Sequence, residues 1–460
     1  MQKVVRGWLS SAACLLALTF SCAKVSAADT LNWNTNKDIV SANIESLPVL
    51  PVLAAVANNT GWKIYLEPNT SRTVSTKFKD LSTGEALRML LGDLNFAIVP
   101  QTNGPNRLYV FRTSIGNATH LISPSQLVST KARSGVIPNE LIVTMKPGAK
   151  IDGLDCLSDA HITGRLDAYH VYRVQFQDAE SAQTARNCLS KNDSVASVDS
   201  NYSMEPPDLP AGVINQSPQF NLTPKANDGN CQIVIGLVDT AVQPVGQGLD
   251  QFLLPSISVA GNPTSGTQLT HGTAMLEGMM QQIQSVTGGK TSVKVLPVDV
   301  YGPNENTSTF DVANGIVQAV NGGANIVNLS LGGGGDTPFL QTLIQNAEKD
   351  GVVFFAAAGN QPVTTPFYPA AYPGVEAVTA SSASGQVADY ADHGSFVSLM
   401  LPGTDVVPYG GQSWAVTGTS TATAFASGIA AGLADSHHAC PQTVIPTMQS
   451  DYGVSFGTGQ

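Results

Sequence analysis

Five continuous apolar runs in the second half of the chain constrain its fold more than any other feature. They lie at residues 233–238, 293–298, 326–331, 352–357 and 375–380. An apolar run of this length without alternation is typical of a strand that is buried on both faces. Stretches with helical spacing, such as 310–320 and 339–350, lie between these runs. The pattern predicts an α/β unit over about 221–460, with a parallel sheet covered by helices on both faces.

Three short motifs place an Asp, a His and a Ser in that order along this unit. Asp239 follows the first apolar run, His271 opens His-Gly-Thr, and Ser420 ends Gly-Thr-Ser ahead of a run of small and apolar residues. A Ser attacks a peptide bond when a neutral His accepts its proton, and that His needs a carboxylate on its other nitrogen. Asp239 lies at the carboxyl end of a strand, where open α/β sheets place their sites. Taken singly, each residue also has an ordinary alternative: a strand-end cap, a solvated His and an N-cap Ser.

Two further strand ends carry residues suited to holding a substrate. Asn360 follows Ala-Gly just past a buried strand, where an amide would donate to a developing oxyanion. The backbone N–H of Ser420, at the positive end of a helix, is a second donor. Ser330, Leu331 and Gly332 open a Gly-rich run, with which a substrate backbone could pair by strand addition. No Lys-Ser or Lys-Thr follows this run, so it is not a phosphate loop.

The five motifs together resemble the subtilase family of serine proteases, over roughly the last 230 residues. The Asp, His and Ser are separated by 32 and 149 residues, spacings that are usual for that family. The resemblance implies an endopeptidase acting on proteins or peptides, with Asp239, His271 and Ser420 as its triad. It also implies that Asn360 and the Ser420 N–H form the oxyanion hole. Residues 330–332 would line the subsite for the residue before the scissile bond.

The chain departs from the family pattern near its His. Glu277 brings a charge to a stretch where the family prefers small apolar residues and Gly, which bears on the packing beside His271. No calcium loop is recognised after His271, and no metal or other cofactor is assigned.

Residues 138–204 predict a second, smaller α+β unit. Its expected elements are strands at 141–145, 171–176 and 195–198, helices at 156–160 and 182–189, and room for one more strand at 162–166. This is a ferredoxin-like pattern. Its place just ahead of the protease-like unit resembles the subtilase propeptide. That resemblance implies a zymogen whose propeptide is a chaperone and an intramolecular inhibitor, with a maturation site in a linker over 205–220. An unrelated ferredoxin-like module is the alternative.

Residues 30–113 predict a third small α+β unit, followed by a Ser/Thr/Gly-rich linker over 114–137. A helix, then Thr60-Gly61, a strand, and a helix bearing Glu85-Ala86-Leu87 resemble the secretin and TonB N-terminus domain. By that resemblance the unit docks on a protein partner in the envelope of a Gram-negative bacterium.

The first 27 residues have the pattern of a secretory signal peptide. Lys3 and Arg6 precede a short apolar stretch, and Val25-Ser26-Ala27 offers small residues for cleavage. A lipid anchor at Cys22 is an alternative reading. Either predicts a secreted or periplasmic protein, and no later segment is long and apolar enough to span a membrane.

Four cysteines remain after the signal peptide, two in each of the last two units. Pairing within units, Cys156 with Cys188 and Cys231 with Cys440, is the simplest hypothesis for an oxidising compartment. Four buried free thiols are the alternative.

The charge balance excludes some partners. The formal net charge is −11, and loss of Lys3, Arg6 and Lys24 with the signal peptide would make it −14. An acidic chain of this kind is not expected to bind nucleic acid or an anionic membrane. Two hypotheses remain: a secreted serine endopeptidase made as a zymogen, or an envelope binding or signalling protein whose subtilase-like unit is inactive or cleaves only itself.

Overall fold

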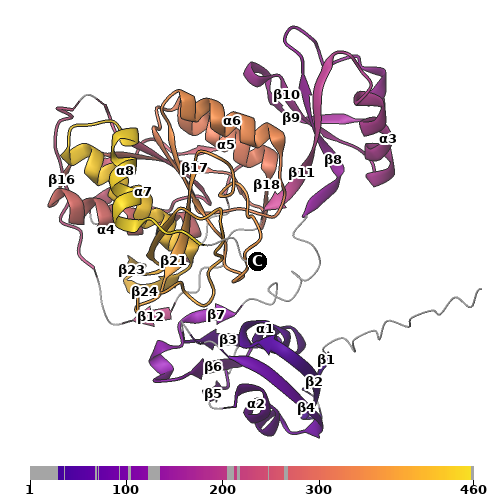
Figure 1. Ribbon diagram of the computed structural model, residues 1–460, viewed down its shortest axis with the longest axis vertical. Helices are drawn as coiled ribbons and strands as arrows, with labels where there is room; N and C mark the ends of the chain where they lie inside the picture. The colour runs from indigo at the N-terminus through magenta and orange to yellow at the C-terminus, as the bar shows by residue number, and fades with distance from the viewer. Residues whose placement is uncertain are drawn as a thin grey trace, which may run out of the picture.

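The computed structural model describes residues 30–456, apart from 36, 68, 69, 71, 93, 102–104, 123–134, 205–211, 215–217, 230, 247 and 264–267. The predicted signal peptide, Cys22 and most of the predicted maturation linker lie outside the described residues. The described part of the chain forms three units in sequence order (Figure 1).

The last unit is built on a seven-stranded parallel sheet of order β15-β17-β14-β19-β20-β21-β22. Its strands are β14 (Val234–Asp239), β15 (Ile257–Ser258), β17 (Lys294–Asp299), β19 (Ile326–Leu329), β20 (Val353–Ala357), β21 (Val375–Ser381) and β22 (Leu399–Pro402). The five apolar runs thus correspond to β14, β17, β19, β20 and β21, and every residue of β14, β19 and β20 is buried. The predicted α/β class is confirmed for this unit.

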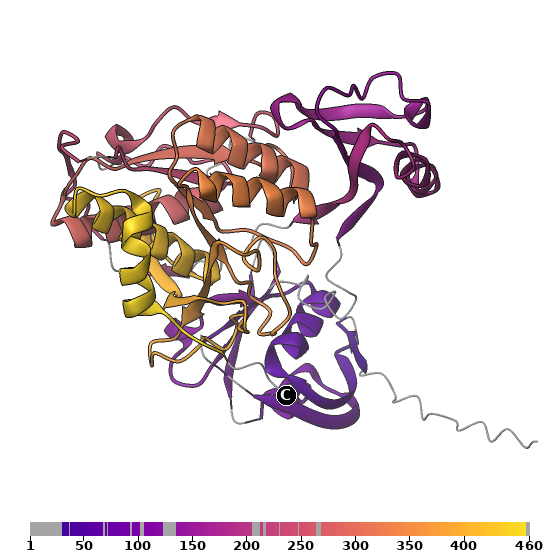
Figure 2. The ribbon, with the colours of Figure 1, turned by 45° about the horizontal axis from the view of Figure 1, so that its top comes forward.

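Helices cover both faces of the sheet, as Figure 2 shows. On one face, α4 (His271–Thr287) and α7 (Thr419–Ser436) share an apolar core with the sheet, and α8 (Ile445–Tyr452) joins them. On the other face lie α5 (Thr309–Asn321) and α6 (Pro338–Lys349). A hairpin of β23 (Thr404–Tyr409) and β24 (Gln412–Thr417) leads into α7, and β12 (Gly212–Ile214) pairs with β24. Two short strands, β13 (Thr223–Pro224) and β16 (Lys290–Thr291), pair beside the main sheet.

The second unit is a four-stranded antiparallel sheet with one helix. Its order is β11-β8-β10-β9, with α3 (Ala179–Leu189) packed on it; the strands are β8 (Val136–Met145), β9 (His161–Leu166), β10 (Val171–Gln175) and β11 (Val195–Met204). The strand expected at 162–166 is confirmed as β9. The helix expected at 156–160 is wrong, since only a 3-10 turn, Asp155–Leu157, forms there. Five residues are too few to repay helix nucleation, and the chain turns back at Ala160 to start β9.

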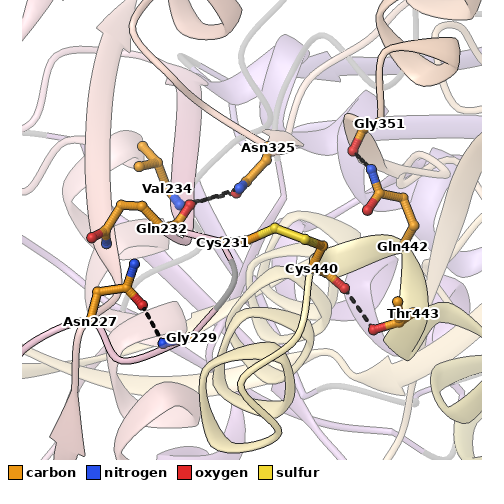
Figure 3. Close-up of a disulfide and its surroundings, with 10 residues drawn as sticks. All are labelled: Asn227, Gly229, Cys231, Gln232, Val234, Asn325, Gly351, Cys440, Gln442 and Thr443. Carbon is orange, nitrogen blue, oxygen red and sulfur yellow. Dashed lines mark hydrogen bonds between the residues drawn. A yellow bond between two sulfur atoms is a disulfide. The ribbon is translucent and has the colours of Figure 1, made fainter.

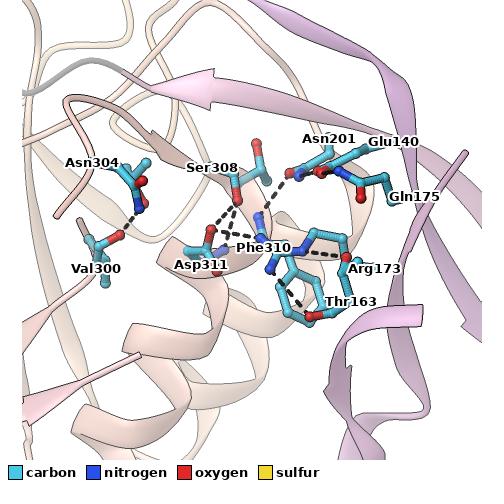
Figure 4. A network of polar contacts seen from close by, with 12 residues as sticks. Glu140, Thr163, Arg173, Gln175, Asn201, Val300, Asn304, Ser308, Phe310 and Asp311 are labelled. Atoms are coloured by element: carbon cyan, nitrogen blue, oxygen red, sulfur yellow. Dashed lines mark hydrogen bonds and ion pairs between the residues drawn. The ribbon is translucent and has the colours of Figure 1, made fainter. Parts of the chain in front are cut away.

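Strand β11 links the second unit to the last one, because β18 (Thr307–Ser308) pairs with its end. Around this junction, Arg173 Nη1 lies 2.8 Å from Asp311 Oδ2 in an ion pair (Figure 4). The Asn201 side chain accepts a hydrogen bond from the Phe310 N–H at 3.1 Å in the first turn of α5. The two units therefore meet through strand pairing and specific polar contacts.

The first unit has two sheets and two helices that share one apolar core. The sheets are β1-β2-β4 and β5-β6-β3-β7; their elements are β1 (Thr30–Asn34), β2 (Ile39–Pro48), α1 (Val49–Thr60), β3 (Lys63–Leu66), β4 (Thr73–Leu81), α2 (Thr83–Leu91), β5 (Asn95–Val99), β6 (Arg107–Phe111) and β7 (His120–Ile122). The predicted boundary at residue 113 is too early. Strand β7 pairs with β3 and buries Ile122 in the core, so the unit extends to residue 122.

Both disulfides form as expected, Cys156 with Cys188 and Cys231 with Cys440. Figure 3 shows the Cys231–Cys440 disulfide, which joins the segment just before β14 to the segment after α7. The next residues are held to the sheet as well, since Asn325 donates to the Gln232 carbonyl at 2.8 Å and accepts from the Val234 N–H at 3.0 Å. Within the described residues, no helix is long and apolar enough to cross a membrane.

Candidate active site

Asp239 and His271 form a buried pair at the carboxyl edge of the parallel sheet. Asp239 is the last residue of β14 and His271 the first of α4. The Nδ1 atom of His271 lies 2.7 Å from Oδ1 and 2.9 Å from Oδ2 of Asp239. The Thr240 N–H donates to the same Oδ1 at 2.7 Å. Asp239 is 1% exposed and His271 5%, so the carboxylate is buried but fully partnered.

Local packing fixes the start of α4 and therefore the position of His271. Thr270 caps α4, since its Oγ1 accepts from the Thr273 N–H. At Gly272 an added Cβ would clash with the Thr240 carbonyl oxygen, so only glycine lets α4 approach the end of β14 so closely. The Gly after the His therefore has a steric role, which sequence reasoning had not assigned.

Ser420 lies at the start of α7, where backbone N–H groups have no partner within the helix. Its Oγ donates to the Ser330 carbonyl at 3.2 Å, and Ser330 Oγ donates back to the Ser420 carbonyl at 3.1 Å. The structure thus brings Ser420 and Ser330 together directly. It does not show a bond from Ser420 to His271, whose Nε2 is buried with no hydrogen-bond partner in the described part of the chain.

Asn360 lies beside the first turn of α7. Its Oδ1 accepts from the N–H and from the Oγ1 of Thr419, both at 2.9 Å. Two donors on the amide oxygen leave the Nδ2 group as the half that can donate elsewhere. Thr419 was part of a predicted motif, but its role in orienting this amide was not foreseen.

The predicted substrate-binding run lies next to Ser420. Ser330 and Leu331 are fully buried, and Gly332 packs against Phe367, where a Cβ would clash. Gly333 exchanges two backbone hydrogen bonds of 2.8 Å with Tyr368. The hydroxyl and the carbonyl group of Ser330 are thus both hydrogen-bonded to Ser420.

A pair of buried acidic residues, Glu277 and Asp405, lies near α4. Glu277 is the residue at which the sequence departs from the family pattern. Burial raises the pKa of Glu277 to about 8, and the nearby Asp405 carboxylate adds to this rise. Burial also raises the pKa of Asp405 to about 7, although hydrogen bonds from Val406 and Gln281 oppose the rise. The Glu277 Oε2 atom is buried with no hydrogen-bond partner among the described residues.

Among the residues that the structure describes, no group of three or more His, Cys, Asp or Glu side chains is arranged to hold a metal ion.

Comparison with known proteins agrees with this arrangement. The family model of the subtilase family (Peptidase_S8) matches residues 230–447. Thermitase of Thermoactinomyces vulgaris is 31% identical over 206 residues, which cover 44% of this chain and 74% of thermitase. The thermophilic serine proteinase of Bacillus sp. strain AK1 is 30% identical over 206 residues, or 44% of this chain and 51% of that protein. The chain spans about half the length of the first curated relatives that it matches.

Two solved structures share the fold at low sequence identity. The epidermin leader peptide processing serine protease of Staphylococcus aureus has a TM-score of 0.53 at 15% identity and covers 67% of this chain and 92% of that one. Fervidolysin of Fervidobacterium pennivorans has a TM-score of 0.50 at 20% identity and covers 66% of this chain and 56% of that one. With a parallel seven-stranded sheet and the Asp, His and Ser motifs at its carboxyl edge, the chain belongs to the subtilase family.

Proposed function

We propose that this chain is a serine endopeptidase made as a zymogen, which hydrolyses peptide bonds through an acyl-enzyme on Ser420. One observation carries the proposal: a buried Asp239–His271 pair, joined through Nδ1, lies at the same sheet edge as Ser420, with the Asn360 amide beside it. The substrates would be proteins or peptides, bound along residues 330–332.

In the acylation step, Ser420 Oγ attacks the carbonyl carbon while its proton moves to Nε2 of His271. His271 carries its Nδ1 proton toward Asp239, which fixes this tautomer and stabilises the imidazolium that forms. The Ser420 hydroxyl must leave its bond to the Ser330 carbonyl and turn to Nε2. Such bonds are often absent before substrate binds and form in the complex.

The negative charge that develops on the carbonyl oxygen needs donors in place. Asn360 Nδ2 and the Ser420 N–H would supply them, the second reinforced by the dipole of α7. When the tetrahedral intermediate collapses, the C–N bond breaks and His271 gives its proton to the leaving amine. Water then attacks the ester with His271 again as base, which frees Ser420 and the new carboxylate.

The second unit, residues 136–204, would be the propeptide. Its sheet order β11-β8-β10-β9, antiparallel throughout, fits the ferredoxin-like pattern. The fold match to the epidermin leader protease covers 67% of the chain, which is more than the last unit alone occupies. The Arg173–Asp311 ion pair and the Asn201 cap on α5 join it to the peptidase unit.

The end of the second unit runs toward Ser420. A Cβ added at Gly335 would meet the Tyr202 ring, and one added at Gly333 would lie next to Met204, so the end of β11 passes beside this Gly-rich run. This Gly-rich run begins at Ser330. Ser330 in turn is bonded to Ser420.

Strand β12 leads to the same place. Gly212 pairs with Ala415 and Ile214 with Ser413, so β12 runs antiparallel to β24. Followed toward its N-terminus, β12 approaches the end of β24, which leads into Ser420. We therefore propose that maturation cuts the chain between residues 205 and 211.

Export is part of the proposal. Two disulfides are expected of a protein that folds outside the cytoplasm, either secreted or periplasmic. The first unit is proposed to dock on an envelope protein, on the strength of its resemblance to the secretin and TonB N-terminus domain.

The test is the intact mass of the purified protein, expressed from residue 28, beside its Ser420→Ala variant. We expect wild type to yield a fragment that starts between residues 205 and 211, and the variant to remain uncut. Ser436→Ala serves as the matched control, since Ser436 is exposed at the other end of α7 and should leave processing unchanged.

Labelling with a fluorophosphonate separates the two candidate functions. Label on wild type and on Ser436→Ala, but not on Ser420→Ala, supports an activated serine. If wild type is neither cut nor labelled, the endopeptidase proposal fails and the binding or signalling protein takes its place.

A further inference from the structure

We infer that Asp392 is a positioning residue for the oxyanion donor Asn360; the inference rests on the proposed endopeptidase activity. Asp392 is completely buried and lies 32 residues beyond Asn360 in the chain. Its Oδ1 accepts from the backbone N–H of Gln361 at 2.8 Å and of Val363 at 3.3 Å. One carboxylate oxygen thus holds the backbone directly after the predicted donor.

The backbone of Asp392 holds the other side of the same loop. The Asp392 N–H donates to the Gly359 carbonyl at 2.8 Å, and the next residue, His393, donates to the Val363 carbonyl at 3.0 Å. Thr379 Oγ1 in β21 donates to the Asp392 carbonyl at 2.6 Å, which ties the arrangement to the parallel sheet. Asn360 therefore stands in a loop that is anchored on both flanks to one residue.

The fit between Asp392 and Gly359 is too close for any other residue at 359. Gly359 has a φ of +114°, and a Cβ there would clash with Asp392 Oδ2. The positive φ of Gly359 and the Asp392 carboxylate that fills the space beside it therefore both require glycine at this position.

Two separate supports then act on the Asn360 amide. Thr419 orients the side chain through Oδ1, and Asp392 sets the backbone from which that side chain extends. An oxyanion donor must be held to within about 0.5 Å to stabilise the transition state. Without the carboxylate, the N–H groups of Gln361 and Val363 lose a buried acceptor, and the loop must move to satisfy them.

A double-mutant cycle tests the assignment, with kcat and KM measured on a peptide substrate. Asp392→Ala should lower kcat by about tenfold to a hundredfold, with KM within about threefold of wild type. In the Asn360→Ala background the same change should lower kcat by less than about threefold, because the donor it positions is already gone. Asp392→Asn should restore most of the activity, since its amide oxygen can accept the same bonds.

Asp389 is the matched control, as it lies three residues earlier and its carboxylate is near Arg112 of the first unit. Asp389→Ala should keep kcat within about threefold of wild type. If Asp392→Ala does not fold, Gly359→Ala disturbs the same contact and should show the same loss of effect in the Asn360→Ala background. An equal loss in both backgrounds would overturn the inference while leaving the proposed function standing. No hydrolysis by mature wild type would overturn the proposed function and this inference with it.

Discussion

Helix α4 is flanked by two buried carboxyl sites that differ in how their charge is met. At the start of the helix, Asp239 accepts hydrogen bonds from the first helical residue, His271, and from the Thr240 N–H. One and a half turns further on, Glu277 lies near Asp405, and one oxygen of Glu277 has no hydrogen-bond partner in the described residues. Both sites are almost completely shielded from solvent.

The two sites differ in what lies beside the buried carboxyl group: a histidine and a backbone N–H at the first site, and a second carboxyl group at the other. Hydrogen-bond donors replace the lost hydration of Asp239, whereas burial raises the pKa of both Glu277 and Asp405 and so favours their neutral forms. The first site is suited to bearing a negative charge during chemistry. The second site favours protonated carboxyl groups, so its contribution to stability falls when they ionise.

The largest effect should come from removing the charge at the partnered site. Asp239→Asn keeps the shape but can neither hold the His271 tautomer nor stabilise an imidazolium, so kcat should fall by about 10⁴. The measurement is kcat on a peptide substrate, with the far-UV circular dichroism spectrum as a check on folding. A loss below about tenfold would mean that Asp239 is not the third triad member.

Removing the unpartnered acid should have an effect that depends on pH. The pKa of Glu277 is about 8 in the folded state and near 4.5 in the unfolded state, so between these values the folded chain keeps a proton that the unfolded chain has lost. Stability due to Glu277 is therefore greatest below pH 4.5 and is lost as the pH rises toward 8. Glu277→Gln should stabilise the fold by about 2 kcal/mol at pH 9 and little at pH 4.

Thermal unfolding at the two pH values checks this, in a Ser420→Ala background to prevent self-digestion. A midpoint that changes equally at both pH values would show that packing, not titration, governs the position. We also expect Glu277→Gln to change the kcat of the active enzyme by less than about threefold, because Glu277 does not contact the reacting groups.

The smallest of these effects should follow Asp405→Asn. Asp405 already accepts from the Val406 N–H at 2.7 Å and from Gln281 at 3.3 Å, and its pKa of about 7 lies below that of Glu277. Stabilisation at pH 9 should be about 1 kcal/mol, and less if Gln281 loses its acceptor. A larger gain than that of Glu277→Gln would reverse the order of the two acids.

The apolar runs were enough to predict the parallel sheet, because a strand that is buried on both faces cannot alternate between apolar and polar residues. They could not predict its edges, since β15 is two residues long and β22 reads Leu-Met-Leu-Pro without a long apolar run. The error at 156–160 has the same origin: a few apolar residues at helical spacing do not show whether the chain continues as a helix. Strand β7 was missed because its pairing partner, β3, lies more than fifty residues earlier.

The motifs predicted where Asp239, His271 and Asn360 would lie, and the structure brings the first two into contact. The roles of Asp239, His271, Ser420 and Asn360 stay predictions until activity is measured. Asp392 could not have been found in this way. It stands in Tyr-Ala-Asp-His-Gly, a stretch with no motif, and only the folded chain brings it to the loop of Asn360.

The Cys231–Cys440 disulfide has a consequence for a chain that other copies of the same protein could cleave. It spans 209 residues and encloses all the predicted site residues, from Asp239 to Ser420. A cut anywhere inside this ring would leave both fragments on one molecule, with the β14 end still joined to the segment after α7. Closing so long a loop also lowers the chain entropy of the unfolded state, which stabilises the fold of the uncut chain by roughly 5 kcal/mol. A nicked copy would therefore keep its two halves together and could fold again as one.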